Sequence, residues 1–259
     1  MGSDEHGHSY RCIAASLEGF IQQVAVSYIR TGHFFYVRGT IPADADAAAV
    51  DTKIIAKYGI DITRWGRALR KQRGEANMQY MRLHREFLIM ATHGQSLFFE
   101  LEGEQVQDCR RRPIKICGYS LSYRGGHPHV RIDLETYLAF KAEMTVQALR
   151  LSRVELESVL GTQRFVPYAP VRRQLWNVWR EVNRVRAMAG LELVTQECLP
   201  LRRRIVRPFV DIPVIPLSVE AVPQTPTPVS SPVAPRDWLM QHGLPLRSPT
   251  TISDRDNDG

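Results

Sequence analysis

Short strand-like segments that follow one another across tight turns restrict the fold of this chain more than any other feature. Residues 78–83 and 86–92 form one such pair. Residues 113–123 and 129–132 form another, separated by the Gly-Gly pair at 125–126 that is typical of hairpins. Strands joined by short turns run antiparallel. The sequence therefore predicts a mainly antiparallel sheet and argues against a doubly wound parallel one.

Helical patterns surround these strands and fill the region after them. Asp133 is placed to cap a helix that runs to about residue 151, and Ser152 and Glu155 form a capping box for the next. Pro170 occupies the favoured first position of a third helix. Earlier in the chain the predicted elements are a strand at 33–41 and helices at 46–58 and 64–73. The predicted fold class is α+β, with flanking helices, a C-terminal helical block and a disordered Pro-rich tail.

Three segments follow from composition. We expect a polar N-terminal segment at 1–27 and a single basic α+β domain at 28–208, with its sheet part at 28–133 and its helical part at 134–208. Residues 209–259 are rich in proline and predict a disordered, acidic tail, because proline removes backbone donors and disfavours a preceding helix. A short motif around Trp238 in this tail is a candidate site for a protein partner.

The compartment is predicted from what the sequence lacks. No run approaches the roughly 18 apolar residues that a membrane span needs, and residues 1–10 lack the apolar stretch of a secretory signal. The four cysteines are scattered, and Cys117 lies in an apolar run that suggests a small core residue. We expect a cytoplasmic protein without a membrane partner.

Charge is unevenly distributed. The formal net charge is +7, and residues 208–259 carry three arginines against six acidic residues. The remainder is therefore strongly basic, which favours a polyanionic partner such as DNA or RNA. A basic surface kept for solubility is the alternative.

The predicted helix at 170–189 is the clearest binding candidate. An apolar stripe recurs at three- and four-residue steps, and Arg173, Asn177, Arg180 and Arg184 recur at the same steps on another face. The guanidinium groups suit phosphate oxygens, Asn177 suits a base edge, and Trp176 suits stacking. The same pattern also fits a solvated amphipathic helix with Trp176 and Trp179 in the core.

Further basic clusters strengthen this prediction. The predicted helix at 64–73 contains no acidic residue, and we expect Trp65 and Leu69 to anchor it by one face. Its candidate phosphate contacts are Arg64, Arg67, Arg70, Lys71 and Arg73. Two arginine triplets add to them, at 110–112 and at Arg202, Arg203 and Arg204.

One short motif suggests chemistry. His127-Pro128-His129 in an extended chain points both imidazoles to the same side, as a metal site requires. This spacing resembles the histidine pair of the HUH class of single-strand nucleases and relaxases. That resemblance implies a site for Mg²⁺ or Mn²⁺ and a nucleophilic tyrosine, here Tyr137. A third ligand is open between His93, His84 and Glu100, and Pro128 departs from the bulky apolar residue usual there.

Four longer stretches resemble an uncharacterised bacterial protein family. They are residues 32–42, 113–132, 168–186 and 201–209. The resemblance implies one folded unit and transfers no activity. There is no phosphate-binding loop, dinucleotide fingerprint or nucleophile elbow. The leading hypothesis is a nucleic-acid-binding protein, from a mobile element or a regulatory system. A metal-dependent nuclease or strand-transfer enzyme and a non-enzymatic protein-protein adaptor are the alternatives.

Overall fold

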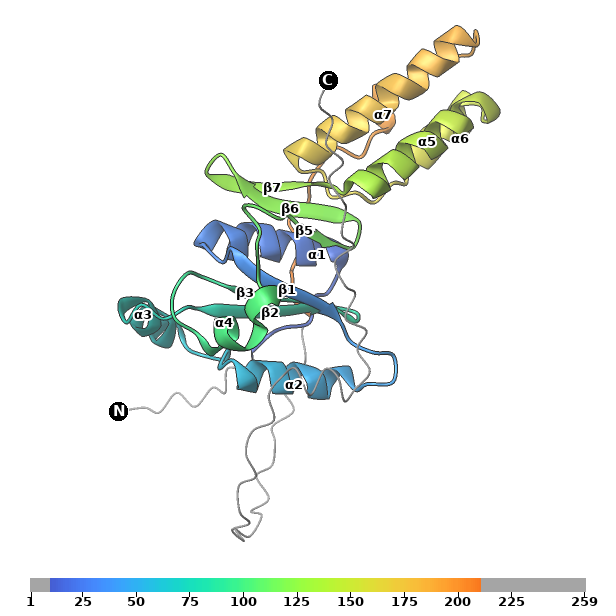
Figure 1. Ribbon diagram of the computed structural model, residues 1–259. Helices are drawn as coiled ribbons and strands as arrows, with labels where there is room; N and C mark the ends of the chain where they lie inside the picture. The colour runs from blue at the N-terminus through green and yellow to red at the C-terminus, as the bar shows by residue number, and fades with distance from the viewer. Residues whose placement is uncertain (1–9, 211–259) are drawn as a thin grey trace, which may run out of the picture. The chain divides into compact units, whose positions relative to one another are not determined.

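The computed structural model describes residues 10–210, and it has the predicted α+β class with antiparallel sheets (Figure 1). The chain divides into two units, Met1–Ile215 and Pro216–Gly259, and all the structure described below belongs to the first. The predicted disordered tail from residue 211 onward and the partner motif around Trp238 lie outside the described residues. None of the helices between residues 10 and 210 is long and apolar enough to cross a membrane.

The first sheet has four antiparallel strands. They are β1 (Phe35–Thr40), β2 (Met78–Leu83), β3 (Glu86–Ala91) and β4 (Gln107–Asp108), in the order β2-β3-β1-β4. A tight turn at His84, which adopts a left-handed φ of 52°, joins β2 to β3. Both faces of this sheet are covered. The residues of β2 and β3 are therefore nearly all buried instead of alternating between core and solvent.

The second sheet consists of β5 (Ile114–Ile116), β6 (Tyr119–Arg124) and β7 (His127–Ile132), in the order β5-β6-β7. The single strand predicted at 113–123 is two strands, because Cys117 and Gly118 take left-handed φ values of 48° and 77° and reverse the chain. The prediction that Cys117 is a core residue is wrong, since this turn exposes it to solvent.

A helical segment before β1 lies in the core between the two sheets (Figure 1). It comprises α1 (Leu17–Gln22), a π-helical turn η1 (Gln23–Tyr28) and a 3₁₀ turn η2 (Ile29–Thr31). Phe20, Ile21 and Val24 are completely buried against both sheets. Composition alone predicts that these residues belong to a polar segment before the domain. In the structure they belong to its core, because their apolar side chains recur at helical spacing among polar ones.

Two of the next three helices pack on the other face of the first sheet, whereas the middle one lies beside the sheet and buries no residue (Figure 1). The three helices are α2 (Ala47–Lys57), α3 (Arg64–Gln72) and α4 (Leu97–Glu102), followed by the 3₁₀ turn η3 (Gly103–Gln105). Side chains cap all three helices at their N-termini, from Asp46, Thr63 and Ser96. Beneath α2, the carboxylate of Asp51 accepts hydrogen bonds from Arg82 at 2.7 Å and from the Tyr80 hydroxyl at 2.5 Å. The buried charge of Arg82 is therefore compensated.

The remaining helices extend from the second sheet. They are α5 (Leu134–Arg150), α6 (Arg153–Gly161) and α7 (Ala169–Met188), with the 3₁₀ turn η4 (Gln196–Cys198) after them. The predicted capping box of Ser152 and Glu155 is present at the start of α6. α5 and α7 pack side by side (Figure 1). Beyond η4 the chain returns to the first helix, where the Gln22 side chain donates to the Val206 carbonyl at 2.9 Å.

Candidate nucleic-acid interface

The predicted polar face of α7 is exposed. Its inner stripe of Val171, Leu175, Val178 and Val182 is buried, whereas Arg173, Asn177, Arg180 and Arg184 are all exposed. Arg184 pairs with Glu181 at 2.7 Å, and Arg173 and Arg180 form no ion pair with a described residue. Two of the three guanidinium groups are therefore not neutralised by carboxylates within residues 10–210.

The two tryptophans of α7 contribute to packing. The rings of Trp176 and Trp179 meet edge to face at 5.7 Å, and both residues are partly buried. The indole nitrogen of Trp179 donates to the Val194 carbonyl at 3.0 Å. Trp179 therefore stabilises the fold through its hydrogen bond, and the Trp176 ring packs against it.

The hairpin of β6 and β7 carries a second set of cationic side chains. His127, His129 and Arg131 alternate with the buried Val130 and Ile132 and share one side of β7. Arg124 of β6 lies opposite His127 in the strand register, so it belongs to the same side. None of these residues forms an ion pair with a carboxylate among the described residues.

Positive charge gathers around His129. Partial burial lowers the pKa of its imidazole most, and the charges of Arg124, Arg131, His127 and Arg173 lower it further. Arg173 comes from α7, so the structure brings the predicted arginine helix and the predicted histidine pair into one site. We call these five residues the hairpin cluster: Arg124, His127, His129, Arg131 and Arg173.

A pair of hydrogen bonds holds the start of α7 at this site. The side-chain amide of Gln174 donates to the carbonyl of Ile132 at 3.0 Å and accepts from its backbone N–H at 2.8 Å. β7 is the last strand of its sheet, so these outward backbone groups would otherwise lack a strand partner. Arg173, the neighbour of Gln174, is thereby kept close to His129.

The three arginines at 110–112 differ in their surroundings. Arg110 pairs with Asp108 at 2.7 Å and stacks over the Phe34 ring at 4.7 Å. The Phe34 ring in turn lies 4.8 Å from that of Tyr123. Arg110 is therefore neutralised and structural, whereas Arg111 and Arg112 are exposed.

The predicted basic helix at 64–73 is present as α3, but its attachment differs from the prediction. Trp65 is 86% exposed and Leu69 is 45% exposed, so the prediction that they anchor the helix is wrong. The helix buries no residue. The Asn77 side chain instead donates to the Arg67 carbonyl at 3.1 Å, and Arg70 lies 3.9 Å from Glu75. Polar contacts replace the expected apolar ones.

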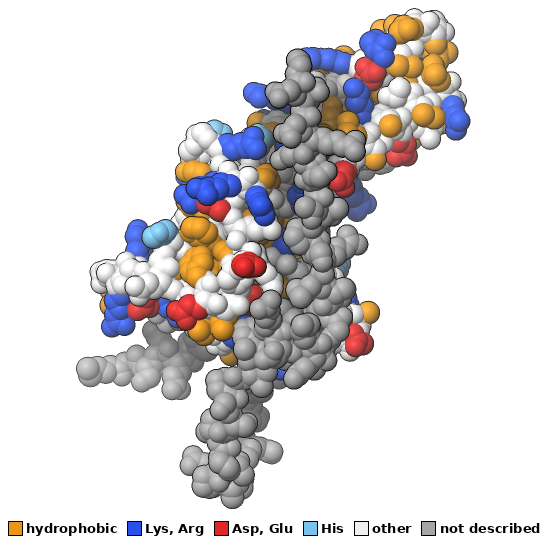
Figure 2. Space-filling model, viewed as in Figure 1, with side chains coloured by type: hydrophobic (Ala, Val, Ile, Leu, Met, Phe, Trp, Pro, Cys, Tyr) orange, Lys and Arg blue, Asp and Glu red, His pale blue; other side chains and the backbone are white. Residues whose placement is uncertain are grey.

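The other candidate phosphate contacts are distributed over two segments. In and next to α3, Arg64, Lys71 and Arg73 are exposed and Arg67 is partly so. Arg202, Arg203 and Arg204 are exposed in the extended segment after η4, and Arg203 stacks over the Tyr168 ring at the start of α7, 4.3 Å away. Figure 2 shows Lys and Arg side chains recurring along the left-hand edge of the view, from α3 past the β6–β7 hairpin towards α7.

The predicted metal site at His127 and His129 lacks further ligands among the described residues. Within residues 10–210 no three His, Cys, Asp or Glu side chains come together as a metal site. The three candidate third ligands lie elsewhere: His84 in the β2–β3 turn, His93 after β3, and Glu100 in α4. Mg²⁺ and Mn²⁺ prefer carboxylate oxygens, whereas the charges around His129 are positive. Tyr137 packs against the core from α5.

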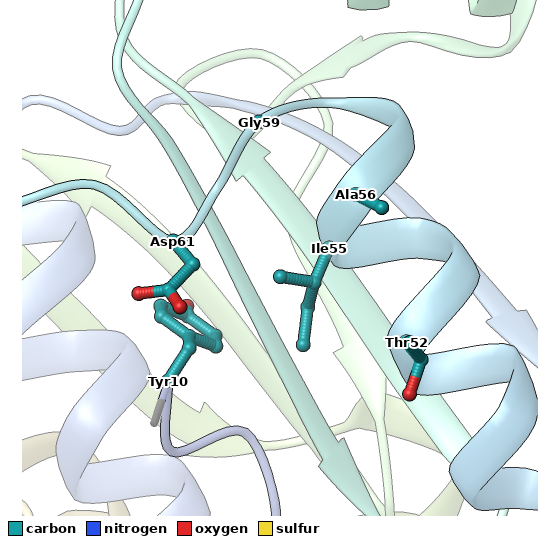
Figure 3. A pocket seen from close by; sticks show the side chains of 6 residues that line it. All are labelled: Tyr10, Thr52, Ile55, Ala56, Gly59 and Asp61. Carbon is teal, nitrogen blue, oxygen red and sulfur yellow. The ribbon is translucent and has the colours of Figure 1, made fainter. Parts of the chain in front are cut away.

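A shallow hollow of about 370 Å³ opens beside α2 (Figure 3). Tyr10 and Asp61 line one side, and Thr52, Ile55 and Ala56 of α2 line the other. The Tyr10 hydroxyl donates to the Tyr80 carbonyl and accepts from its N–H, both at 2.9 Å, and burial raises the pKa of this phenol above its usual range. Tyr10 therefore has a structural role in holding the N-terminal stretch of the chain against β2. The residues that line the hollow include no nucleophile paired with a base.

Comparison with protein-family models gives no match, and comparison with curated proteins gives no significant match. The sequence indicated Arg173 as a phosphate contact and the histidine pair as a metal site, without relating one to the other. Arg124 and Arg131 were missed, because single arginines within a strand and a hairpin turn carry no local signal.

Proposed function

We propose that the protein binds nucleic acid, with the hairpin cluster and the exposed face of α7 contacting phosphates. The observation that carries the proposal is the composition of the neighbourhood of His129. Four cationic or titratable basic side chains from three elements, β6, β7 and α7, lie around it, and none has a carboxylate partner among the described residues. Such a concentration of positive charge is favourable when an anion is bound and repulsive when none is.

Arginine chemistry supports phosphate as the anion. A guanidinium group donates two parallel hydrogen bonds to phosphate oxygens, and most contacts between proteins and nucleic acids are to the phosphate backbone. Asn177 and Arg180 continue the exposed face of α7 away from the cluster. The surface therefore extends along a helix, as a polymeric ligand requires, and Asn177 can reach a base edge.

Salt dependence tests this proposal. We expect labelled DNA or RNA to bind at about 50 mM salt and to be released steeply towards about 200 mM, because bound cations displace condensed counterions. Replacing Arg173 with glutamine should weaken binding and reduce the slope of log K against log salt by about 0.9 for a duplex. Fluorescence anisotropy measures both.

A matched control separates a specific site from total charge. Arg153→Gln removes the same unit of charge from α6, where Arg153 pairs with Glu157 at 3.1 Å. This variant should keep the affinity and slope of the unmodified protein. Equal losses for both variants would contradict a site at the hairpin cluster, and no binding at low salt would refute nucleic-acid binding altogether.

A further inference from the structure

An exposed tryptophan distinguishes α3 from the other basic segments. Trp65 is 86% exposed, and Leu69, one helical turn later, is 45% exposed. Ala68 lies between them on the same face and is also exposed. A tryptophan normally buries most of its large apolar surface, so this open aromatic platform is not explained by the packing of the fold.

Cations border the platform. Arg64 and Lys71 are exposed and lie two helical turns apart, next to the face that carries Trp65. Neither of them, nor Arg73 just beyond the helix, forms an ion pair with a described residue. The helix contains no acidic residue to neutralise them. An apolar ring and uncompensated positive charge therefore lie side by side.

Hydrogen bonds hold both ends of α3 in place. The Thr63 side chain caps the first turn, where the N–H of Gly66 donates to its hydroxyl at 3.2 Å. At the other end the N–H of Glu75 donates to the Arg70 carbonyl at 2.9 Å. These contacts hold the two ends of α3 and do not involve the Trp65 ring. The ring is thus presented without serving the fold.

One intermediate segment links α3 to the strand that carries the histidine pair. The charge of Arg67 acts on Tyr28 and His33, which lie at the end of the helical segment before β1. That segment packs on β7, the strand that carries the histidine pair. In the view of Figure 1, α3 and the turn of the β6–β7 hairpin both project to the left.

We propose that α3 binds single-stranded nucleic acid, with Trp65 stacked on an unpaired base and Arg64 and Lys71 against the flanking phosphates. This inference rests on the proposed function and specifies its ligand. Bases in a duplex are stacked on each other and offer no free face, whereas unpaired bases stack on aromatic side chains next to basic grooves. A membrane surface is disfavoured, because two apolar side chains on a helix of 9 residues make a weak interfacial anchor.

The test compares a labelled oligothymidylate with a duplex of the same length, using the full chain. Trp65→Ala should lower the affinity for the single strand by about 5- to 100-fold and leave the affinity for the duplex unchanged. Trp65→Phe retains a ring and should restore most of the loss. Leu134→Ala, which removes an exposed apolar side chain from α5, should change neither affinity. Thermal unfolding of Trp65→Ala should match that of the unmodified protein, since the ring is not packed.

Each contrary outcome has a distinct meaning. If Trp65→Ala binds the single strand normally while Arg173→Gln weakens binding, the inference is overturned and the proposed function stands. If the unmodified protein binds neither strand form at low salt, both fall. If Trp65→Ala loses binding to vesicles containing phosphatidylserine but not to oligothymidylate, α3 is a membrane element and the inference is overturned.

Discussion

His33 illustrates how a single buried group links stability to pH. Its side chain is 6% exposed, and its Nε2 has no hydrogen-bond partner among the described residues. Nδ1 lies 3.2 Å from the Tyr28 carbonyl, which can only accept, so Nδ1 carries the proton of the neutral ring. Burial lowers the pKa of His33 to about 4, and the charge of Arg67 acts in the same direction.

The lowered pKa of His33 makes the folded protein less stable as the pH falls. Above the ordinary pKa of 6.5 the ring is neutral in both states, whereas between 6.5 and about 4 the unfolded chain binds a proton that the folded one excludes. The free energy of unfolding should therefore fall with decreasing pH by about 1.4 kcal/mol per unit from this residue. We expect urea unfolding of His33→Gln to lose about 2 kcal/mol less than the unmodified protein between pH 6.5 and 5. Parallel losses would show that His33 is protonated within the folded protein.

At the scale of elements, α7 combines a buried stripe, an exposed cationic face and an attachment to the edge of β7. The attachment depends on Gln174, which satisfies both backbone groups of Ile132. Since Arg173 is the preceding residue, the same two hydrogen bonds position a member of the hairpin cluster. The stability of this contact should therefore influence binding.

Replacing Gln174 with alanine tests that link. The N–H of Ile132 loses its partner, so its hydrogen exchange should accelerate about fivefold or more, corresponding to the loss of about 1 kcal/mol. Affinity for nucleic acid should fall modestly, because Arg173 is less well positioned. Asn177→Ala, a change on the exposed face of the same helix, should leave the exchange of Ile132 unchanged. Unaltered exchange in Gln174→Ala would contradict the assigned role.

The elements that the sequence predicted well are those with local signals. The capping box of Ser152 and Glu155 depends on residues within one turn, and the antiparallel pairs β2–β3 and β6–β7 depend on the short turns between neighbouring segments. The errors at Trp65 and Cys117 have another origin. Residue type indicates that a side chain can be buried, but only the tertiary arrangement provides a surface to bury it against. The approach of Arg173 to His129 is likewise a contact between distant segments.

At the scale of the molecule, the helical segment before β1 connects the two sheets. Its apolar side chains contact buried residues of both sheets in one continuous core. A chain that begins at residue 28, where composition placed the start of the domain, lacks Phe20, Ile21 and Val24. All three are fully buried, so each truncated site would leave a cavity.

We therefore expect the chain of residues 28–259 to lose its cooperative unfolding transition. Several large buried side chains are removed at once, and each typically contributes a few kcal/mol, which together exceeds the stability of most domains. Circular dichroism during thermal unfolding measures this, with the full chain as the control. A cooperative transition at the original temperature would show that the two sheets pack without this segment.

The close approach of Gly19 to the returning chain has a consequence for biosynthesis. A Cβ atom at Gly19 would lie 2.9 Å from the Cα of Pro208, so the first helix is shaped to receive the last described segment. Gln22 and Val206, which bond there, are 184 residues apart. At about 5–20 residues per second, the ribosome delivers the second on the order of 10–40 s after the first. During that interval the side of the first helix at Gly19 and Gln22 lacks the segment that packs on it in the folded protein.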